Sequence, residues 1–492
     1  MSKKLIKARK YEKEISRHIQ GKKPIFHVVA PIGWINDPNG FSWYEGKCHL
    51  FCQYHPYSTQ WGPMHWAHYC TKDMISWELL PCAMAPDESY DSEGCFSGSA
   101  LVLEKDHILM YTAVSEKTNA DGQRYSIQQQ AIAIGDGEQY QKLEQNPVIT
   151  SDMLPEGCSR KDFRDPKIWE ENGIYYALIA NQSELGEGQV LLYSSRDIRH
   201  WIFVSVFDNS GGKYGKMWEC PDFFCLDGQE LLLVCPQFMQ ADGLAFHNGN
   251  NAVYFIGKRD AELKKFIRSE AKQIDYGTDF YAPQTTLTPD GRRILIGWMQ
   301  NWDNRVCPDS FNWCGMMTIP RELSLQNGCL LQTPIRELLN YRTQETKYSK
   351  VVLSEMQGEV QLDGVSGRCL DLTVIFTTEG CLAFKIKLAS DGKKIGTYLS
   401  LDIKKGILSL DRTYSGMRQD VLTSRSMYTD TCHETVKLRI LMDYYSIEVF
   451  ANNGKDVMSM LIYTPIEADK MVFSCEGETE ITVEKYNIEV KK

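Results

Sequence analysis

The sequence lacks any apolar run close to the roughly 20 residues that a membrane-spanning helix needs, so we expect no membrane partner. It also lacks an excess of positive charge, because 54 basic and 64 acidic residues give a net charge of −10. Nucleic acids and anionic membranes are bound by basic surfaces, and this balance disfavours both as partners. A neutral small molecule fits the composition better.

The first twenty residues lack the apolar core of a secretory signal and are rich in charge, which predicts a charged helix and a cytoplasmic protein. The 16 cysteines include no Cys-x-x-Cys pair of the kind that holds common zinc sites. They are scattered through apolar, strand-like segments, so we expect reduced, mostly buried thiols and no disulfide framework. Neither a metal ion nor a cofactor is expected.

Long amphipathic helices are also missing between residue 25 and about residue 331, where short apolar runs are broken by glycine, proline, asparagine and aspartate. Examples are His107-Ile-Leu-Met-Tyr-Thr-Ala113 and Ile174-Tyr-Tyr-Ala-Leu-Ile-Ala180. Many short strands of this kind are typical of an all-β domain. A segment of about 300 residues is too long for one sandwich of roughly 100 residues.

Two motifs recur at similar offsets. Lys72-Asp-Met-Ile-Ser-Trp-Glu78 is similar to Arg196-Asp-Ile-Arg-His-Trp-Ile202, 124 residues later, and the two Asp-Pro sites are 128 residues apart. Candidate strand starts follow at intervals of 60, 68, 54 and 61 residues, at Asp37, Ser97, Asp165, Glu219 and Phe280. These intervals predict a five-bladed β-propeller, in which the first strands of all blades converge on one axial pocket.

The pattern changes near residue 334. The segment 334–341 predicts a short helix, and the polar residues 342–350 read as a linker. Beyond them apolar residues alternate with polar ones, as at Leu370, Leu372 and Val374, and Asn453-Gly454 is a hairpin signal. We therefore expect a propeller domain at 1–343, with a short N-terminal helical segment, and a β-sandwich at 344–492.

Three carboxylates, Asp37, Asp165 and Glu219, lie among backbone-restricting or aromatic residues. Proline follows both aspartates, which favours extended backbone there. Asn36 and the turn amides after Asp37 would favour its ionised form, whereas an apolar wall of residues 218, 220 and 221 would raise the pKa of Glu219. Glycoside hydrolysis uses such a pair. The alternative for Asp37 is a simple turn former.

The motifs Trp34-Ile-Asn-Asp-Pro-Asn-Gly40, Arg164-Asp-Pro166 and Glu219-Cys-Pro221, in this order, resemble those of the β-fructofuranosidases of glycoside hydrolase family 32. Further similar segments are Gln53-Tyr-His-Pro56, Gln60-Trp-Gly-Pro63, Phe96-Ser-Gly-Ser99, Asp275-Tyr-Gly-Thr-Asp-Phe-Tyr-Ala-Pro-Gln284, Gly297-Trp-Met-Gln-Asn-Trp302 and Ser446-Ile-Glu-Val-Phe450. The resemblance implies a five-bladed propeller followed by a sandwich, with Asp37 as nucleophile, Glu219 as general acid/base and Asp165 as transition-state stabiliser.

Other residues are expected to support the sugar. Asn36, Gln53 and Ser97 would donate or accept hydrogen bonds, and Trp61 and Phe96 would form apolar walls. Arg164 would hold a hydroxyl and keep Asp165 ionised. For Trp34 and Tyr281 both sugar contact and core packing stay open.

The resemblance implies a retaining enzyme that hydrolyses the fructosyl bond of sucrose or sucrose 6-phosphate through a covalent fructosyl-enzyme. The alternatives are a fructooligosaccharide hydrolase, a fructosyltransferase, an inverting arabinan-type hydrolase and a non-catalytic sugar-binding propeller. Lys213, Lys216 and Arg305 are candidates for a phosphate. The sandwich is expected to cover a propeller face, and a homodimer through it is a further expectation.

Overall fold

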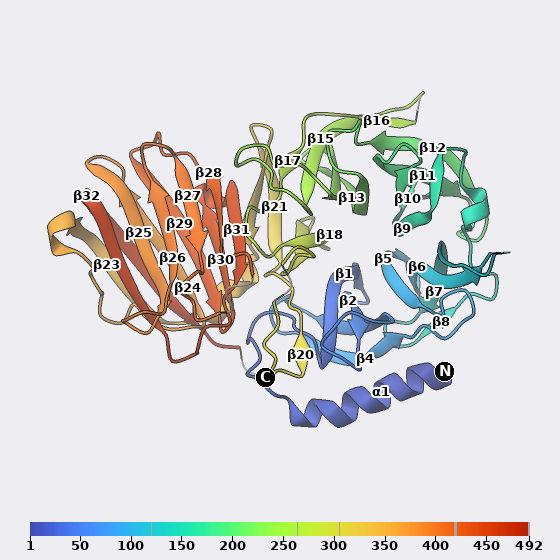
Figure 1. The fold of residues 1–492 in the computed structure, drawn as a ribbon, viewed down its shortest axis with the longest axis horizontal. Coiled ribbons are helices and arrows are strands. Elements are labelled where there is room, and N and C mark those ends of the chain that lie inside the picture. The colour runs from blue at the N-terminus through green and yellow to red at the C-terminus, as the bar shows by residue number, and fades with distance from the viewer. Residues whose placement is uncertain (120, 263, 305, 418–420, 491–492) are drawn as a thin grey trace.

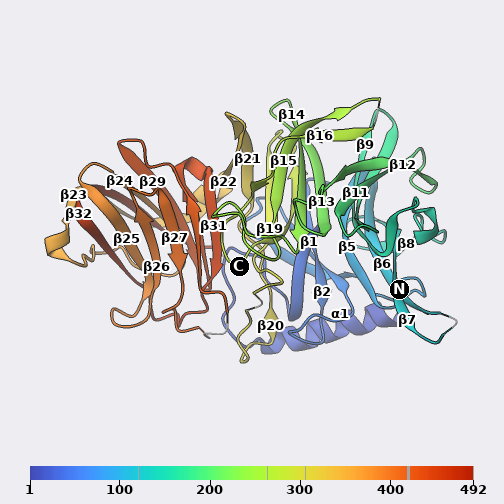
Figure 2. The ribbon, with the colours of Figure 1, turned by 45° about the horizontal axis from the view of Figure 1, so that its top comes forward.

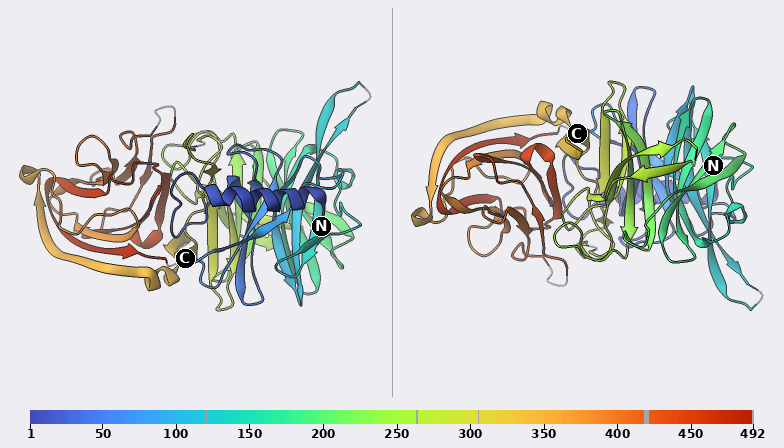
Figure 3. Two further views of the ribbon diagram at one scale, coloured as in Figure 1. Left: turned by 90° about the horizontal axis from the view of Figure 1, so that it is seen from below. Right: turned by 90° about the horizontal axis from the view of Figure 1, so that it is seen from above.

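The computed structural model describes residues 1–119, 121–262, 264–304, 306–417 and 421–490 (Figure 1). The chain begins with helix α1 (Lys3–Ile15), as predicted, and Ser2 caps it by accepting a hydrogen bond from the Leu5 amide at 3.1 Å. The helix packs along the outside of the first blade, where Arg9 Nε donates to the Cys82 carbonyl at 2.8 Å (Figure 3, left). No helix in the described ranges is long and apolar enough to cross a membrane.

Five antiparallel sheets stand around one axis, which confirms the predicted propeller (Figures 1 and 2). The innermost strands are β1 (Gly33–Tyr44), β5 (Gly94–Leu103), β9 (Cys158–Glu171), β13 (Met217–Leu226) and β18 (Tyr281–Leu287). Each contacts the next, and β18 contacts β1, so the ring is closed. Strand β20 (Trp313–Cys314) pairs in parallel with β1.

The outer strands of each blade follow in chain order. They are β2 (Lys47–His55), β3 (His65–Thr71) and β4 (Glu78–Met84); β6 (Asp106–Thr118), β7 (Arg124–Gly135) and β8 (Tyr140–Lys142); β10 (Ile174–Ser183), β11 (Gly188–Ser195) and β12 (Trp201–Asn209); β14 (Gln229–Gln237), β15 (Val253–Asp260), β16 (Lys265–Arg268) and β17 (Lys272–Gln273); and β19 (Arg293–Trp298), β21 (Arg321–Gln326) and β22 (Cys329–Pro334). Buried apolar side chains fill the space between neighbouring blades.

The second part of the chain is the predicted β-sandwich, and its long strand β32 (Lys470–Ile488) belongs to both sheets. The first half of β32 pairs with β25 (Cys381–Ser390), followed by β26 (Thr397–Asp402), β27 (Ile407–Asp411) and β28 (Ser424–Tyr428). The second half pairs with β24 (Leu370–Thr377), followed by β29 (Thr435–Asp443), β30 (Ser446–Ala451) and β31 (Asp456–Leu461). The hairpin signal at Asn453-Gly454 is confirmed, because this turn joins β30 to β31.

The prediction of a linker at 342–350 is wrong. A short 3-10 helix (Arg336–Tyr341) leads directly into strand β23 (Arg342–Ser354), which pairs with β32 along the outside of the sandwich (Figure 3, right). The strand is polar because it lies at a sheet edge and buries only Leu353 well, so the alternation that marks a half-buried strand is weak. The division into units 1–343 and 344–492 stays a prediction.

A buried set of charged side chains joins the propeller to the sandwich; we call it the interface network. His27 contacts Asp443 through Nδ1 at 2.9 Å and Glu448 through Nε2 at 3.0 Å. Arg321 donates to Glu448 at 2.7 Å and to Asp275 at 3.0 Å. Since these groups are fully buried and paired across the two parts, they fix how the parts are docked.

Candidate active site

One irregularity recurs in all five innermost strands: the pairing with the second strand of the blade shifts register. The shifts span residues 35–38 in β1, 95–98 in β5, 164–167 in β9, 219–222 in β13 and 281–284 in β18. A β-bulge bends its strand and re-aims a side chain. Every bulge contains or adjoins a candidate site residue, so the five blades direct these side chains to one end of the axis.

Three bulge residues have left-handed backbone: Asp165 at φ 63°, Cys220 at φ 48° and Ala282 at φ 48°. The expectation of extended backbone at Asp165 is therefore wrong. The bulge overrides the preference set by Pro166, and aspartate tolerates this region better than most residues. Hydrogen bonds hold the conformation, because the Asp165 amide donates to Thr112 Oγ1 at 2.8 Å and the Cys220 amide donates to Asp165 Oδ2 at 3.0 Å.

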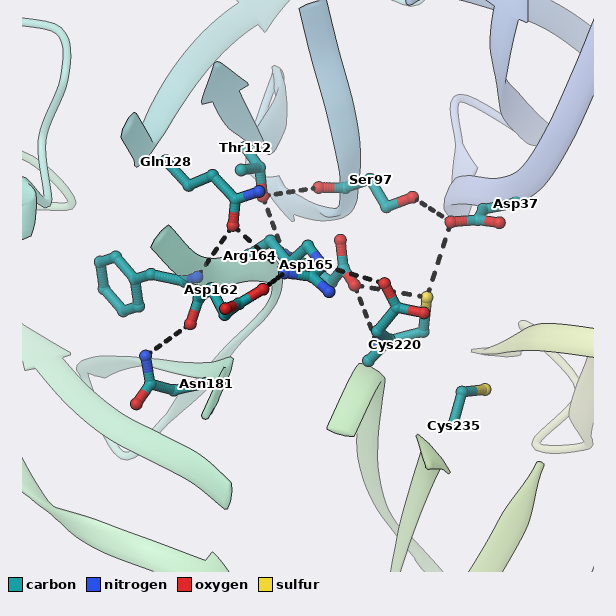
Figure 4. Close-up of polar contacts among 12 residues, drawn as sticks. Asp37, Ser97, Thr112, Gln128, Asp162, Arg164, Asp165, Asn181, Cys220 and Cys235 are labelled. Carbon is teal, nitrogen blue, oxygen red and sulfur yellow. Dashed lines mark hydrogen bonds and ion pairs between the residues drawn. The ribbon is translucent and has the colours of Figure 1, made fainter. Parts of the chain in front are cut away.

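Asp37 is buried, and the hydrogen bonds to its carboxylate within the described residues come from neutral side chains, of which Ser97 and Cys220 are drawn in Figure 4. Asn36 Nδ2 donates to Oδ1 at 3.0 Å; Gln53 Nε2 at 3.0 Å and Ser97 Oγ at 2.6 Å donate to Oδ2. The Cys220 thiol lies 3.7 Å from the same oxygen. An ionised carboxylate accepts and never donates, so this ring of donors suits the charged form and holds its orientation.

Asp165 lies in a different environment. Burial raises its pKa to about 7, the charges of Glu219 and Asp37 add to the rise, and Arg164 lowers it only in part. Three acids therefore share one small region with one guanidinium, and a proton is retained among them near neutral pH. The expectation that Arg164 keeps Asp165 ionised is wrong for the free protein, because burial and two neighbouring carboxylates outweigh one cation.

Glu219 faces polar donors. Arg164 Nε donates to its Oε1 at 2.9 Å, and the Tyr281 hydroxyl donates to its Oε2 at 2.7 Å. The expected apolar wall is wrong, because Trp218 turns its indole N–H to the Tyr214 carbonyl and Cys220 faces the two aspartates. Alternate residues of a strand point to opposite faces, so sequence neighbours of a strand residue seldom surround its side chain.

The predicted supporting residues divide into two groups. Gln53, Ser97 and Asn36 are buried against Asp37, and Tyr281 contacts Glu219. The indole of Trp34 is buried and donates to Asn36 Oδ1 at 2.8 Å, so the structure supports packing beside the site for this residue.

Trp61 and Phe96 contact each other. Trp61 is 44% exposed and packs edge-on against Phe96 with ring centroids 5.7 Å apart. Phe96 directly precedes Ser97, a donor to Asp37, and contact of the two rings with a sugar stays a prediction.

Sequence reasoning missed some of the residues that hold the carboxylates in place. Cys220 lies between two of the carboxylates, with its thiol 3.7 Å from Asp37 and 3.6 Å from Asp165. Contact with the Cys235 thiol, burial and the nearby carboxylates raise the pKa of the Cys220 thiol well above its ordinary value. The thiol therefore remains a neutral donor. Asp162 accepts a hydrogen bond from Arg164 Nη1 at 2.9 Å, and so holds the guanidinium whose Nε donates to Glu219 (Figure 4). The cysteine lies inside a quoted motif, whereas no sequence signal marks Thr112 or Asp162.

The fold and this convergence of acids define a propeller glycoside hydrolase. The family model for the glycosyl hydrolases family 32 N-terminal domain matches residues 27–334, and the model for the glycosyl hydrolases family 32 C terminal matches residues 337–490. The chain belongs to glycosyl hydrolase family 32.

Curated relatives match almost the whole chain. A sucrose-6-phosphate hydrolase of Zymomonas mobilis is 35% identical, with 96% of this chain and 94% of that protein covered. A raffinose invertase of Escherichia coli is 35% identical, with 93% of each covered.

Solved structures are similar as well. The β-fructofuranosidase of Bombyx mori has a TM-score of 0.85 and 31% identity, with 98% of each chain covered. The sucrose-6-phosphate hydrolase of Lactobacillus gasseri has a TM-score of 0.84 and 26% identity, with 99% of this chain and 96% of that chain covered.

Proposed function

We propose that the protein is a retaining β-fructofuranosidase that hydrolyses sucrose or sucrose 6-phosphate through a covalent fructosyl-enzyme. The observation that carries this proposal is the meeting of Asp37, Asp165 and Glu219, from three blades, at the bulged end of the axis. Relatives and structural neighbours named for these two sugars or for β-fructofuranosidase activity support the substrate class.

In this proposal Asp37 attacks the anomeric carbon of the fructosyl unit. Four neutral donors orient the Asp37 carboxylate. A cation in direct contact would lower its nucleophilicity, and none of these four donors carries a charge. The transition state resembles an oxocarbenium ion, so the negative charge beside the anomeric carbon stabilises it. Covalent attack followed by attack of water gives retention, for which the two carboxyl groups are expected to lie about 5 to 5.5 Å apart.

Glu219 protonates the departing oxygen and then deprotonates water. In the free protein the raised pKa belongs to Asp165, so the proposal needs a proton redistribution when substrate enters. Fructosyl hydroxyls that donate to Asp165 favour its ionised form and lower its pKa. The acid limb of the activity should therefore differ between kcat/KM, which reports the free protein, and kcat, which reports the complex.

The preferred substrate is tested by kcat/KM for sucrose, sucrose 6-phosphate and a short inulin-type oligomer. A preference above tenfold, about 1.4 kcal/mol of transition-state stabilisation, assigns the substrate. Release of no fructose and no fructosyl product from any of the three would reject the proposal. A product mixture dominated by transfer at high sucrose would assign a fructosyltransferase instead.

Phosphate recognition has two described candidates. Lys213 is already paired with Glu270 at 2.5 Å, whereas Lys216 is exposed next to the start of β13, where its carbonyl accepts from Gln182. Arg305 lies outside the described residues. If Lys216 binds the phosphate, Lys216→Gln lowers kcat/KM for sucrose 6-phosphate and leaves that for sucrose unchanged, and the matched variant Lys213→Gln changes neither.

Two further proposals concern the setting of the enzyme. We propose a cytoplasmic location, supported by cysteines that are reduced thiols in the structure. We also propose a homodimer through the sandwich, which light scattering of the purified protein would test directly.

A further inference from the structure

A fourth carboxylate lies beside the three acids of the candidate active site. Asp162, on β9, accepts a hydrogen bond from Arg164 Nη1 at 2.9 Å (Figure 4). Arg164 Nε donates to Glu219 Oε1 at 2.9 Å, so Asp162 and Glu219 bind different nitrogens of one guanidinium. Two charged partners give the guanidinium one orientation, because its nitrogens lie in a rigid plane. The cation that contacts Glu219 is therefore held in place by Asp162.

The backbone around Asp162 is fixed by hydrogen bonds of its own. The Asp162 carbonyl accepts from Asn181 Nδ2 at 2.6 Å, and the Asp162 amide donates to Ser159 Oγ at 3.2 Å. Asn181 is fully buried on the neighbouring strand β10. The amide of the next residue, Phe163, donates to Gln128 Oε1 at 2.8 Å. The carboxylate is therefore presented to the guanidinium from a rigid support, as the orientation of a reactive group requires.

The pair of Asp162 and Arg164 is partly withdrawn from water. The side chain of Arg164 is 11% exposed and that of Asp162 is 27% exposed. A second pair on the same stretch of chain is open to solvent, because Arg160 is 69% and Asp152 is 80% exposed. Water and salt screen exposed charges strongly and partly buried charges much less. The charge of Asp162 therefore acts on its neighbours more strongly than that of Asp152.

The charge of Asp162 opposes that of Arg164 at the acids of the site. Burial raises the pKa of Asp165 to about 7, Glu219 adds to the rise, and Arg164 lowers it in part. Burial would lower the pKa of Arg164, but the charges of Glu219, Asp165 and Asp162 raise it above its ordinary value. A carboxylate beside a cation cancels part of the field that the cation exerts on other acids. With Asp162 present, the site retains its proton to a higher pH.

Other groups face the same acids from the elements packed around them. Within the described residues Asp162 is hydrogen-bonded to none of the three acids, so its charge can be removed without removing a donor from any of them. The titratable and charged neighbours are Asp37 of β1, Glu219 and Cys220 of β13, Cys235 of β14, Tyr281 of β18 and, on β9 itself, Arg164 and Lys167, which pairs with Asp222; Ser97, Thr112 and Gln128 of β5, β6 and β7 are uncharged.

We propose that Asp162 is a positioning residue of the fructosidase reaction, which holds Arg164 against Glu219 and offsets part of the Arg164 charge. The inference rests on the proposed function, in which Glu219 must carry a proton to the departing oxygen. Without Asp162 the uncompensated charge of Arg164 favours ionised acids, so the site loses its proton at a lower pH. In this role Asp162 touches no substrate and acts only through Arg164.

The test uses three substitutions of Asp162 and one control. Asp162→Asn keeps an oxygen that can accept from Arg164 and removes the charge alone, Asp162→Ala removes charge and contact, and Asp162→Glu keeps the charge. The matched control is Asp152→Asn, which removes the charge of the exposed acid paired with Arg160. The pH profile of kcat/KM for sucrose reports the proton of the free enzyme. The pH dependence of the free energy of unfolding reports the same proton without substrate.

In Asp162→Asn the alkaline limb of kcat/KM should move to lower pH by about half a unit or more. The loss of stability between pH 5 and 8 should become smaller, because the folded protein releases the proton earlier. Asp162→Ala should show the same shift and a further several-fold loss of kcat, since Arg164 is no longer held. Asp162→Glu should keep the wild-type limb, and Asp152→Asn should change neither measurement.

An alkaline limb and a stability curve that stay unchanged in Asp162→Asn would overturn the inference. So would an equal shift in Asp152→Asn, which would make the effect one of net charge. A wild-type protein that releases no fructose rejects the proposed function instead, and the stability curves of the same variants then decide the role of Asp162. If Asp162→Ala fails to fold, the isosteric variant Asp162→Asn decides.

Discussion

Two groups of buried acids in this molecule differ in how their charge is compensated. In the interface network, Asp443 and Glu448 contact His27, and Glu448 also contacts Arg321. At the candidate active site, Asp37, Asp165 and Glu219 meet with one guanidinium, which Arg164 provides and shares with Asp162. Both groups are largely withdrawn from water, so burial alone does not distinguish a structural acid from a reactive one.

The pKa values of the acids shift in opposite directions in the two groups. Burial would raise the pKa of Asp443 and of Glu448, but hydrogen bonds and charge from His27 and Arg321 outweigh it and lower both. At Asp165 burial and neighbouring carboxylates outweigh Arg164, and the pKa rises to about 7. The interface network stabilises the docking of two domains, whereas the active site keeps a proton and an uncompensated charge available for chemistry.

The largest expected effect is the loss of activity on replacing an acid of the candidate active site. Asp37→Ala removes the proposed nucleophile, so kcat for sucrose should fall by on the order of 10⁴-fold or more. The melting temperature should change far less than the activity, because the variant leaves the buried donors of Asn36, Gln53 and Ser97 unpaired but also removes one of three neighbouring carboxylates. Steady-state kinetics and calorimetry check both statements, and a variant that keeps a tenth of the activity would contradict the assignment.

Arg321→Met breaks the interface network. It leaves Asp275 and Glu448 buried without their guanidinium, so the free energy of unfolding should fall by about 3 to 5 kcal/mol. Chemical denaturation measures the loss, and kcat of the folded protein should remain near wild type. Arg336→Met is the matched control, because its exposed pair with Glu322 is worth about 1 kcal/mol or less. Equal losses in the two variants would contradict the buried role of Arg321.

The raised pKa of Asp165 should make the stability of the protein depend on pH. The folded protein binds its proton up to a pKa of about 7 and the unfolded chain only to about 3.8, so the contribution of this group to stability falls as pH rises from about 4 to 7. Asp165→Asn should remove this slope and raise the free energy of unfolding at pH 8 by roughly 4 kcal/mol, while activity is lost. Denaturation curves from pH 4 to 8 that keep the same slope would argue against the raised pKa.

His27 should lose its contribution to stability in the same direction, with rising pH, but in a more alkaline window. Burial opposes its charge, but Asp443 and Glu448 raise its pKa from 6.5 to about 9. Its contribution is complete below pH 6.5 and is lost as pH rises through 9, at a cost of roughly 3 kcal/mol. His27→Gln should abolish this alkaline decline without changing the slope between pH 4 and 7. An unchanged decline in the variant would assign it to another group.

Much of the fold was predictable because motifs and apolar residues recur at regular intervals in the sequence. The near-regular spacing of Asp37, Ser97, Asp165 and Glu219 predicted the strands that form the axis, and the period-two pattern around Leu370 predicted the sandwich. The five bulges were not predictable, since a bulge depends on the partner strand. For the same reason the contact of Tyr281 with Glu219 was not predicted, although Tyr281 was a candidate site residue: it comes from another blade, 62 residues away. Strand β23 was missed because its polar edge shows little alternation.

The most direct test of the account is to trap the fructosyl-enzyme on Asp37. In Glu219→Gln, an activated fructofuranosyl substrate whose leaving group needs no protonation should still react with Asp37, but water would lack its general base, so the adduct should accumulate. Mass spectrometry of the acid-quenched, digested protein should find one fructosyl unit on the peptide that contains Asp37. An unmodified peptide, together with a first product of inverted anomeric configuration, would contradict the account.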